Sequence, residues 1–77
     1  MNNSRRKEIS KAISMMEQAV AILAGVREEE EMAFENLPEG IQMSERGDAM
    51  QEWIDQLTES EDELQNVVDN LQYKLDE

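Results

Sequence analysis

Apolar residues recur along this chain at alternating steps of three and four, in two stretches separated by a single proline. This spacing is typical of a coiled coil, in which one side of each helix faces its partner. It predicts two long helices, over about residues 5–35 and about 45–75, joined by a loop over 36–44. The first stripe consists of Ile9, Ile13, Met16, Val20 and Leu23, and the second of Met50, Ile54, Leu57, Leu64, Val68, Leu71 and Leu75.

The predicted loop contains the residues that interrupt a helix. Pro38 cannot continue the first helix, and Gly40 is expected to take a positive φ angle, which costs a glycine nothing. Ile41 and Met43 are apolar, so we expect them to fold back over the loop end of the molecule. A loop of this length favours an antiparallel hairpin, an all-α fold in which residues 1–77 form one domain.

The helix ends carry recognisable capping residues. Asn3 or Ser4 is expected to cap the first helix, and Ser44 the second, because a short side-chain oxygen accepts a hydrogen bond from the free amides of a first turn. Gly47 is unusual so early in a helix. We interpret it as a position that allows close contact with the end of the first helix.

Two charged residues occupy positions in these stripes where an apolar residue is expected. Pairing residues whose numbers sum to about 84 brings the two stripes together, for example Ile13 with Leu71, and places Arg27 about one turn from Glu61. Either the two side chains meet, which would fix the register at some cost in stability, or both extend outward into water.

The first helix carries a second apolar stripe that one partner helix cannot cover. An exposed apolar surface of this extent is typical of an interface. Either two hairpins associate through it as a four-helix bundle, which predicts a homodimer, or it binds another protein. This second stripe of the first helix consists of Ala12, Met15, Ala19, Ile22 and Val26, with Trp53 of the second helix at its rim.

The net charge of −12 is large for 77 residues. It disfavours nucleic acids and anionic membranes as partners and permits basic proteins. Five of the seven basic residues lie near the open end of the predicted hairpin, and acidic residues dominate elsewhere. The carboxylates either solubilise the protein or imitate a nucleic-acid backbone toward a basic partner. The residues proposed for this acidic surface are Glu52, Asp55, Glu59 and Asp62.

The sequence contains no cysteine and no histidine. No nucleophile and base can be combined, and the carboxylates match no calcium-binding loop, so we expect no enzymatic activity, no metal site and no cofactor. The longest near-apolar run, Ala19–Val26, is shorter than a membrane span. We therefore expect a soluble, cytoplasmic protein.

The segment Asn36-Leu37-Pro38-Glu39-Gly40-Ile41-Gln42-Met43-Ser44-Glu45-Arg46-Gly47 resembles a linker found in small acidic proteins of bacteriophages and prophages of low-GC Gram-positive bacteria. Those proteins are similar in layout: a basic start, a helix ending in a Glu-rich run, this loop, and an acidic second helix. The resemblance implies a phage accessory origin. It supplies no activity that can be assigned to a residue.

Two functional hypotheses follow. The chain is a protein-binding module of phage origin that blocks a host protein, such as a defence or nucleic-acid-processing factor. Alternatively, it is a coiled-coil oligomer with a structural or assembly role and no host target. The two differ in whether the protein retains a partner other than itself.

Overall fold

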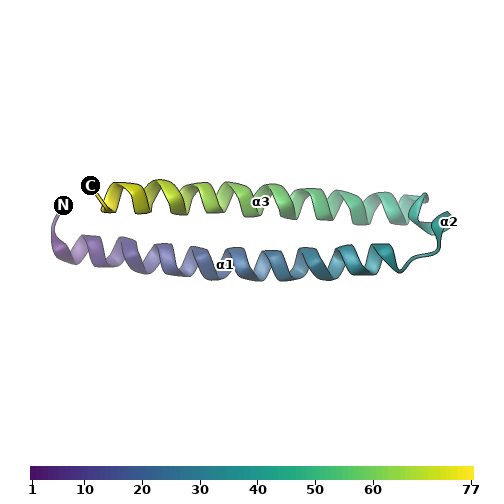
Figure 1. Ribbon diagram of the computed structural model, residues 1–77, viewed down its shortest axis with the longest axis horizontal. Helices are drawn as coiled ribbons and strands as arrows, with labels where there is room; N and C mark the ends of the chain where they lie inside the picture. The colour runs from purple at the N-terminus through teal and green to yellow at the C-terminus, as the bar shows by residue number, and fades with distance from the viewer.

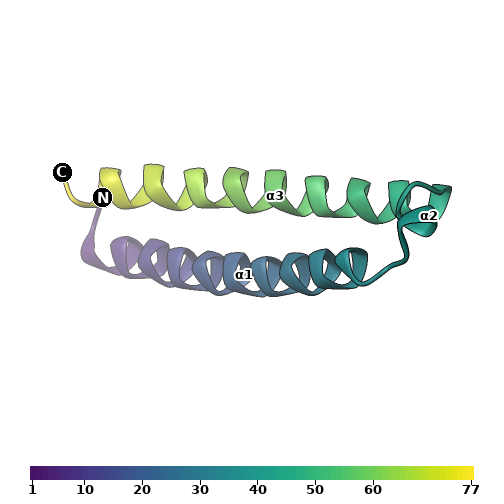
Figure 2. The ribbon, with the colours of Figure 1, turned by 45° about the vertical axis from the view of Figure 1, so that its right-hand side comes forward.

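The computed structural model describes all residues 1–77 and consists of helices only: α1 (Asn3–Glu35), α2 (Glu39–Gln42) and α3 (Glu45–Leu75). The two long helices, α1 and α3, lie side by side and run in opposite directions (Figure 1). Both chain ends lie at one end of the molecule and α2 at the other (Figure 2). The predicted all-α hairpin is thereby confirmed, as a rod with Cα dimensions of 58 × 14 × 14 Å.

The two predicted apolar stripes face each other between α1 and α3, and we call this contact the seam. Ile13 is only 2% exposed, and Ile54, Leu57 and Val68 are also buried. The other members, such as Met16 and Leu64, are half-buried. Burial of these side chains is the main force that holds two amphipathic helices together, since helix propensity alone is weak.

The open end of the hairpin is closed by polar contacts. The cap of α1 is Asn2, whose Oδ1 accepts a hydrogen bond from the amide of Arg5 at 2.8 Å. The helix therefore begins at Asn3, two residues earlier than predicted. Arg6 Nη1 donates to the carbonyl of Leu75 at 3.0 Å, which satisfies a free acceptor at the end of α3.

The turn differs from the prediction in three ways. Residues Glu39–Gln42 form the short helix α2, and no glycine has a positive φ angle, so the expected role of Gly40 is wrong. Met43 is 78% exposed and does not fold back over the turn. Ser44 stands at the cap position of α3, but its hydroxyl donates to the carbonyl of Ile41 and does not cap the helix.

Gln42 and Gly47 fix the position of α2. The Gln42 side chain donates to the carbonyls of Phe34 at 3.0 Å and Glu35 at 3.4 Å, two of the last acceptors of α1. Its backbone carbonyl lies directly against Gly47 of α3, where a Cβ atom would stand 2.5 Å from the Gln42 carbonyl carbon. Gly47 thus allows close contact with α2, and not with the end of α1 as predicted.

We predict opposite effects of the same substitution at two helical glycines. Gly47→Ala should destabilise the protein by about 1–3 kcal/mol, because the new methyl group overlaps the backbone of α2. Gly25→Ala should stabilise it by about 0.5–1 kcal/mol, because nothing lies within 4 Å of that position and alanine favours the helix. Urea unfolding at one protein concentration measures both. Equal stabilisation by the two substitutions would contradict the observed packing of α2.

Candidate protein interface

The charged interruption of the seam is an ion pair. Arg27 Nε donates to Glu61 Oε2 at 2.7 Å, and its Nη2 to Oε1 at 3.3 Å. Arg27 Nη1 also donates to Glu31 at 2.8 Å. The side chains of Arg27 and Glu61 are only 23% and 12% exposed. Of the two arrangements that the sequence left open, the folded chain adopts the paired one.

Hydrogen bonds to Glu61 and then to Glu31 raise the pKa of the Arg27 guanidinium above its ordinary value. Because the pKa of Arg27 is raised in the folded protein, the stabilisation that its charged form gains from these hydrogen bonds is present at low and neutral pH. It is lost only as the pH rises through the pKa of the folded state. For an arginine that loss lies beyond the working range of proteins. Arg27 therefore stays charged in the seam, and its position there depends on the two carboxylates.

Because desolvating a charge pair offsets much of its attraction, we predict that Arg27→Leu with Glu61→Leu raises the thermal midpoint. Arg27→Leu alone should lower it most, because Glu61 then lies mostly buried without a cation. Glu61→Leu alone should cost less, since Arg27 retains Glu31. Thermal melting followed by circular dichroism ranks the four proteins. A double variant less stable than the wild type would show that the pair contributes net stability.

The second stripe of α1 lies outside the seam. Met15 is 61% exposed and Ile22 67%, Val26 is also exposed, and Ala19 is half-buried. In contrast with the buried Ile13 on the seam side of the same helix, these side chains gain little from the pairing of α1 with α3. The stripe identified in the sequence is therefore an uncovered apolar surface in the hairpin.

Helix α3 contributes to this surface. Trp53 and Val67 directly precede the buried Ile54 and Val68, just as Val26 directly precedes Arg27 in the seam of α1. In an antiparallel pair such positions flank the same side of the seam. The structure agrees, since Trp53 shares one shallow recess with Val26 and Leu57, and Val67 shares another with Leu23 and Leu64.

We call this side of the rod the apolar face. Trp53 is 62% exposed on it, and Val67 is exposed as well. Like Trp53, Val67 stands one residue before a seam residue of α3, and both therefore belong to the apolar face. The apolar face consists of Ala12, Met15, Ala19, Ile22, Val26, Trp53 and Val67.

The opposite side of the seam is polar. Residues that directly follow seam positions include Glu17 of α1 and Gln51, Gln65 and Gln72 of α3. The three glutamines donate hydrogen bonds at 2.9–3.1 Å to aspartates one turn further along α3. The two sides of the seam therefore differ, with polar side chains along one and exposed apolar side chains along the other.

The proposed acidic surface, Glu52, Asp55, Glu59 and Asp62, lies exposed along α3. None of the four takes part in an ion pair, and only Asp55 accepts a side-chain hydrogen bond, from Gln51. Like charges at spacings of three and four repel each other along a helix. No cation of the chain neutralises these four carboxylates.

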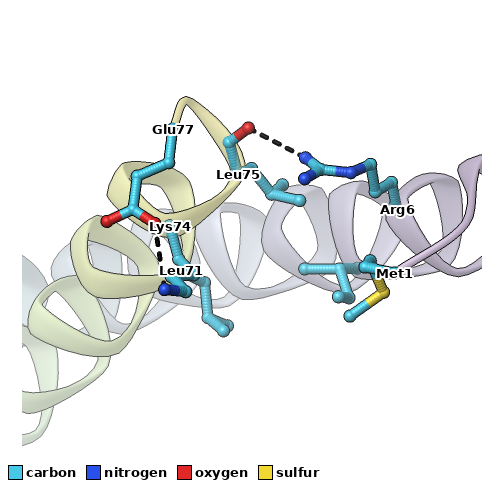
Figure 3. A pocket seen from close by; sticks show the side chains of 7 residues that line it. Met1, Arg6, Leu71, Lys74, Leu75 and Glu77 are labelled. Carbon is cyan, nitrogen blue, oxygen red and sulfur yellow. Dashed lines mark hydrogen bonds and ion pairs between the residues drawn. The ribbon is translucent and has the colours of Figure 1, made fainter.

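A recess of about 340 Å³ lies at the open end, between the start of α1 and the end of α3 (Figure 3). Ile9, Leu71 and Leu75 supply most of its apolar lining. The two cationic side chains beside it already have partners. Arg6 donates to the carbonyl of Leu75, and Lys74 pairs with Glu77 at 2.9 Å. The recess therefore reflects the separating chain ends, and it holds no group aimed at a ligand.

By length and composition alone, α1 is also sufficient to cross a membrane, since it contains an 18-residue stretch with at most two charged residues. Two apolar stripes on one helix produce such a composition, and here one of them packs against α3. The expectation that the protein does not associate with membranes stays a prediction.

Comparison of the chain with protein-family models, with characterised proteins and with solved structures gave no match. The functional argument therefore depends on the surfaces of the hairpin itself.

Proposed function

We propose that this hairpin is a non-enzymatic protein-binding module that acts through its apolar face. The observation that carries the proposal is the exposure of Met15, Ile22 and Trp53, each more than 60%, on one flank of a rod whose other flank is polar. Large apolar side chains gathered on one side of a soluble protein typically mark an interface. Trp in particular contributes strongly to binding when a partner covers it.

A second candidate function uses the acidic surface. Four unpaired carboxylates along α3 suit a basic partner, and this supports the idea of a phage protein that blocks a host protein by occupying its nucleic-acid site. The phage origin rests on the resemblance of the segment from Asn36 to Gly47 alone. The alternative, a structural or assembly role, needs only the apolar face.

We predict that Met15→Glu with Ile22→Glu abolishes binding to whatever protein the apolar face engages, including a second copy. Both side chains point away from the seam, so the helical content should not change. The matched control, Ser14→Glu with Ala21→Glu, adds the same charge at exposed positions of α1 with the same spacing but outside the apolar face, and it should bind normally. Affinity capture from bacterial lysate, with circular dichroism of each variant, measures both. Equal retention of partners by the two double variants would reject the apolar face.

Salt distinguishes the two candidate functions. A basic partner held by the acidic surface should dissociate as salt screens the charges, and replacing Glu52, Asp55, Glu59 and Asp62 by lysine should abolish its capture. A partner held by the apolar face should resist salt and survive that replacement. Capture that is insensitive to salt and to the lysine substitutions would eliminate the electrostatic candidate.

A further inference from the structure

We propose that the occupant of the apolar face is a second copy of this chain, packed antiparallel through α1 about a two-fold axis at Ala19. The inference deepens the proposed function, on which it rests, by naming the partner. It follows from the order of side chains within the apolar face, from the charges at the two ends of α1 and from the area that the rod offers.

The stripe on α1 is self-complementary about its centre. When two antiparallel copies pack with their Ala19 residues facing each other, Ala12 of each copy lies opposite Val26 of the other. Met15 of each copy then lies opposite Ile22 of the other. A symmetric interface requires this reciprocity, in which residue i contacts j and j contacts i. The small alanine at the axis allows the two helices to approach closely, and the two largest exposed side chains of the stripe cover each other.

The charges of α1 select the antiparallel orientation. The helix begins with Arg5, Arg6, Lys7 and Lys11 and ends with the run Glu28–Glu31. An antiparallel copy places each basic start beside the acidic end of its partner, whereas a parallel copy would align two runs of four glutamates. Opposite charges across an interface favour the correct register, and like charges oppose the wrong one.

The side of the rod that carries the apolar face suits a dimer. It is 58 Å long and 14 Å wide in Cα dimensions, so the apolar face together with the polar residues around it is comparable in extent to the ~800 Å² that each partner buries in a standard interface. Trp53 and Val67 flank the same side, so they extend the contact beyond α1. With only four apolar residues buried in the single hairpin, the second copy adds burial that the fold otherwise lacks.

Single cysteines test the arrangement, because the chain contains none of its own. Ala19→Cys should form an intermolecular disulfide, since the two residues meet at the axis. Ala12→Cys should form it at least about tenfold more slowly, because two residues seven positions from the axis lie ~21 Å apart, far beyond the reach of a disulfide. An equal mixture of Ala12→Cys and Val26→Cys should form the mixed disulfide readily.

The mass of the wild-type chain, measured by sedimentation equilibrium at micromolar concentration, completes the test. We expect a dimer that added salt strengthens or leaves unchanged, because the net charge of −12 on each copy is repulsive. Rapid self-linking of both Ala19→Cys and Ala12→Cys would indicate a parallel dimer and overturn the proposal.

A folded monomer without cysteine cross-linking would also overturn it. In that case, capture of another protein that still requires Met15 and Ile22 would leave the proposed function standing. A monomer that captures nothing would reject both proposals. Helical content equal to that of the wild type shows that each cysteine variant is folded.

Discussion

Two helices packed as a pair touch along a single line, and each can bury only one side against the other. In this protein that line accommodates the seam, in which Ile13, Ile54, Leu57 and Val68 are buried. The second stripe of α1 lies too far round the helix to reach α3, so Met15 and Ile22 remain exposed. The uncovered face is therefore a geometric consequence of placing two apolar stripes on one helix and providing one partner helix.

The register of the pair is fixed at three heights along the rod. Gln42 joins the end of α1 to the turn, the Arg27–Glu61 pair crosses the seam, and Arg6 reaches the last residue of α3. An antiparallel pair with a defined register also has defined flanks. It is this register that places Trp53 beside Val26 and makes one apolar face from residues of two helices.

The structure of the turn explains why the segment from Asn36 to Gly47, which resembles a phage linker, says little about function. Pro38 precedes α2, Gln42 caps α1, Ser44 bonds back to Ile41, and Gly47 admits the backbone of α2. Each of these residues has a structural task in reversing the chain. The exposed apolar side chains of the proposed interface lie on the long helices instead, where the sequence is ordinary for an acidic coiled coil.

The sequence by itself determined the two long helices, their antiparallel pairing and the membership of both stripes, because periodicity follows directly from helix geometry. It also located α3 closely, from Glu45 to Leu75. The tertiary structure decided what depends on distant contacts: the choice of the paired state by Arg27 and Glu61, the short helix α2, the reason for Gly47, and the placement of Trp53 and Val67 on the same flank as the second stripe of α1. Those features depend on contacts between residues far apart in the chain, and the spacing of apolar residues at steps of three and four does not specify such contacts.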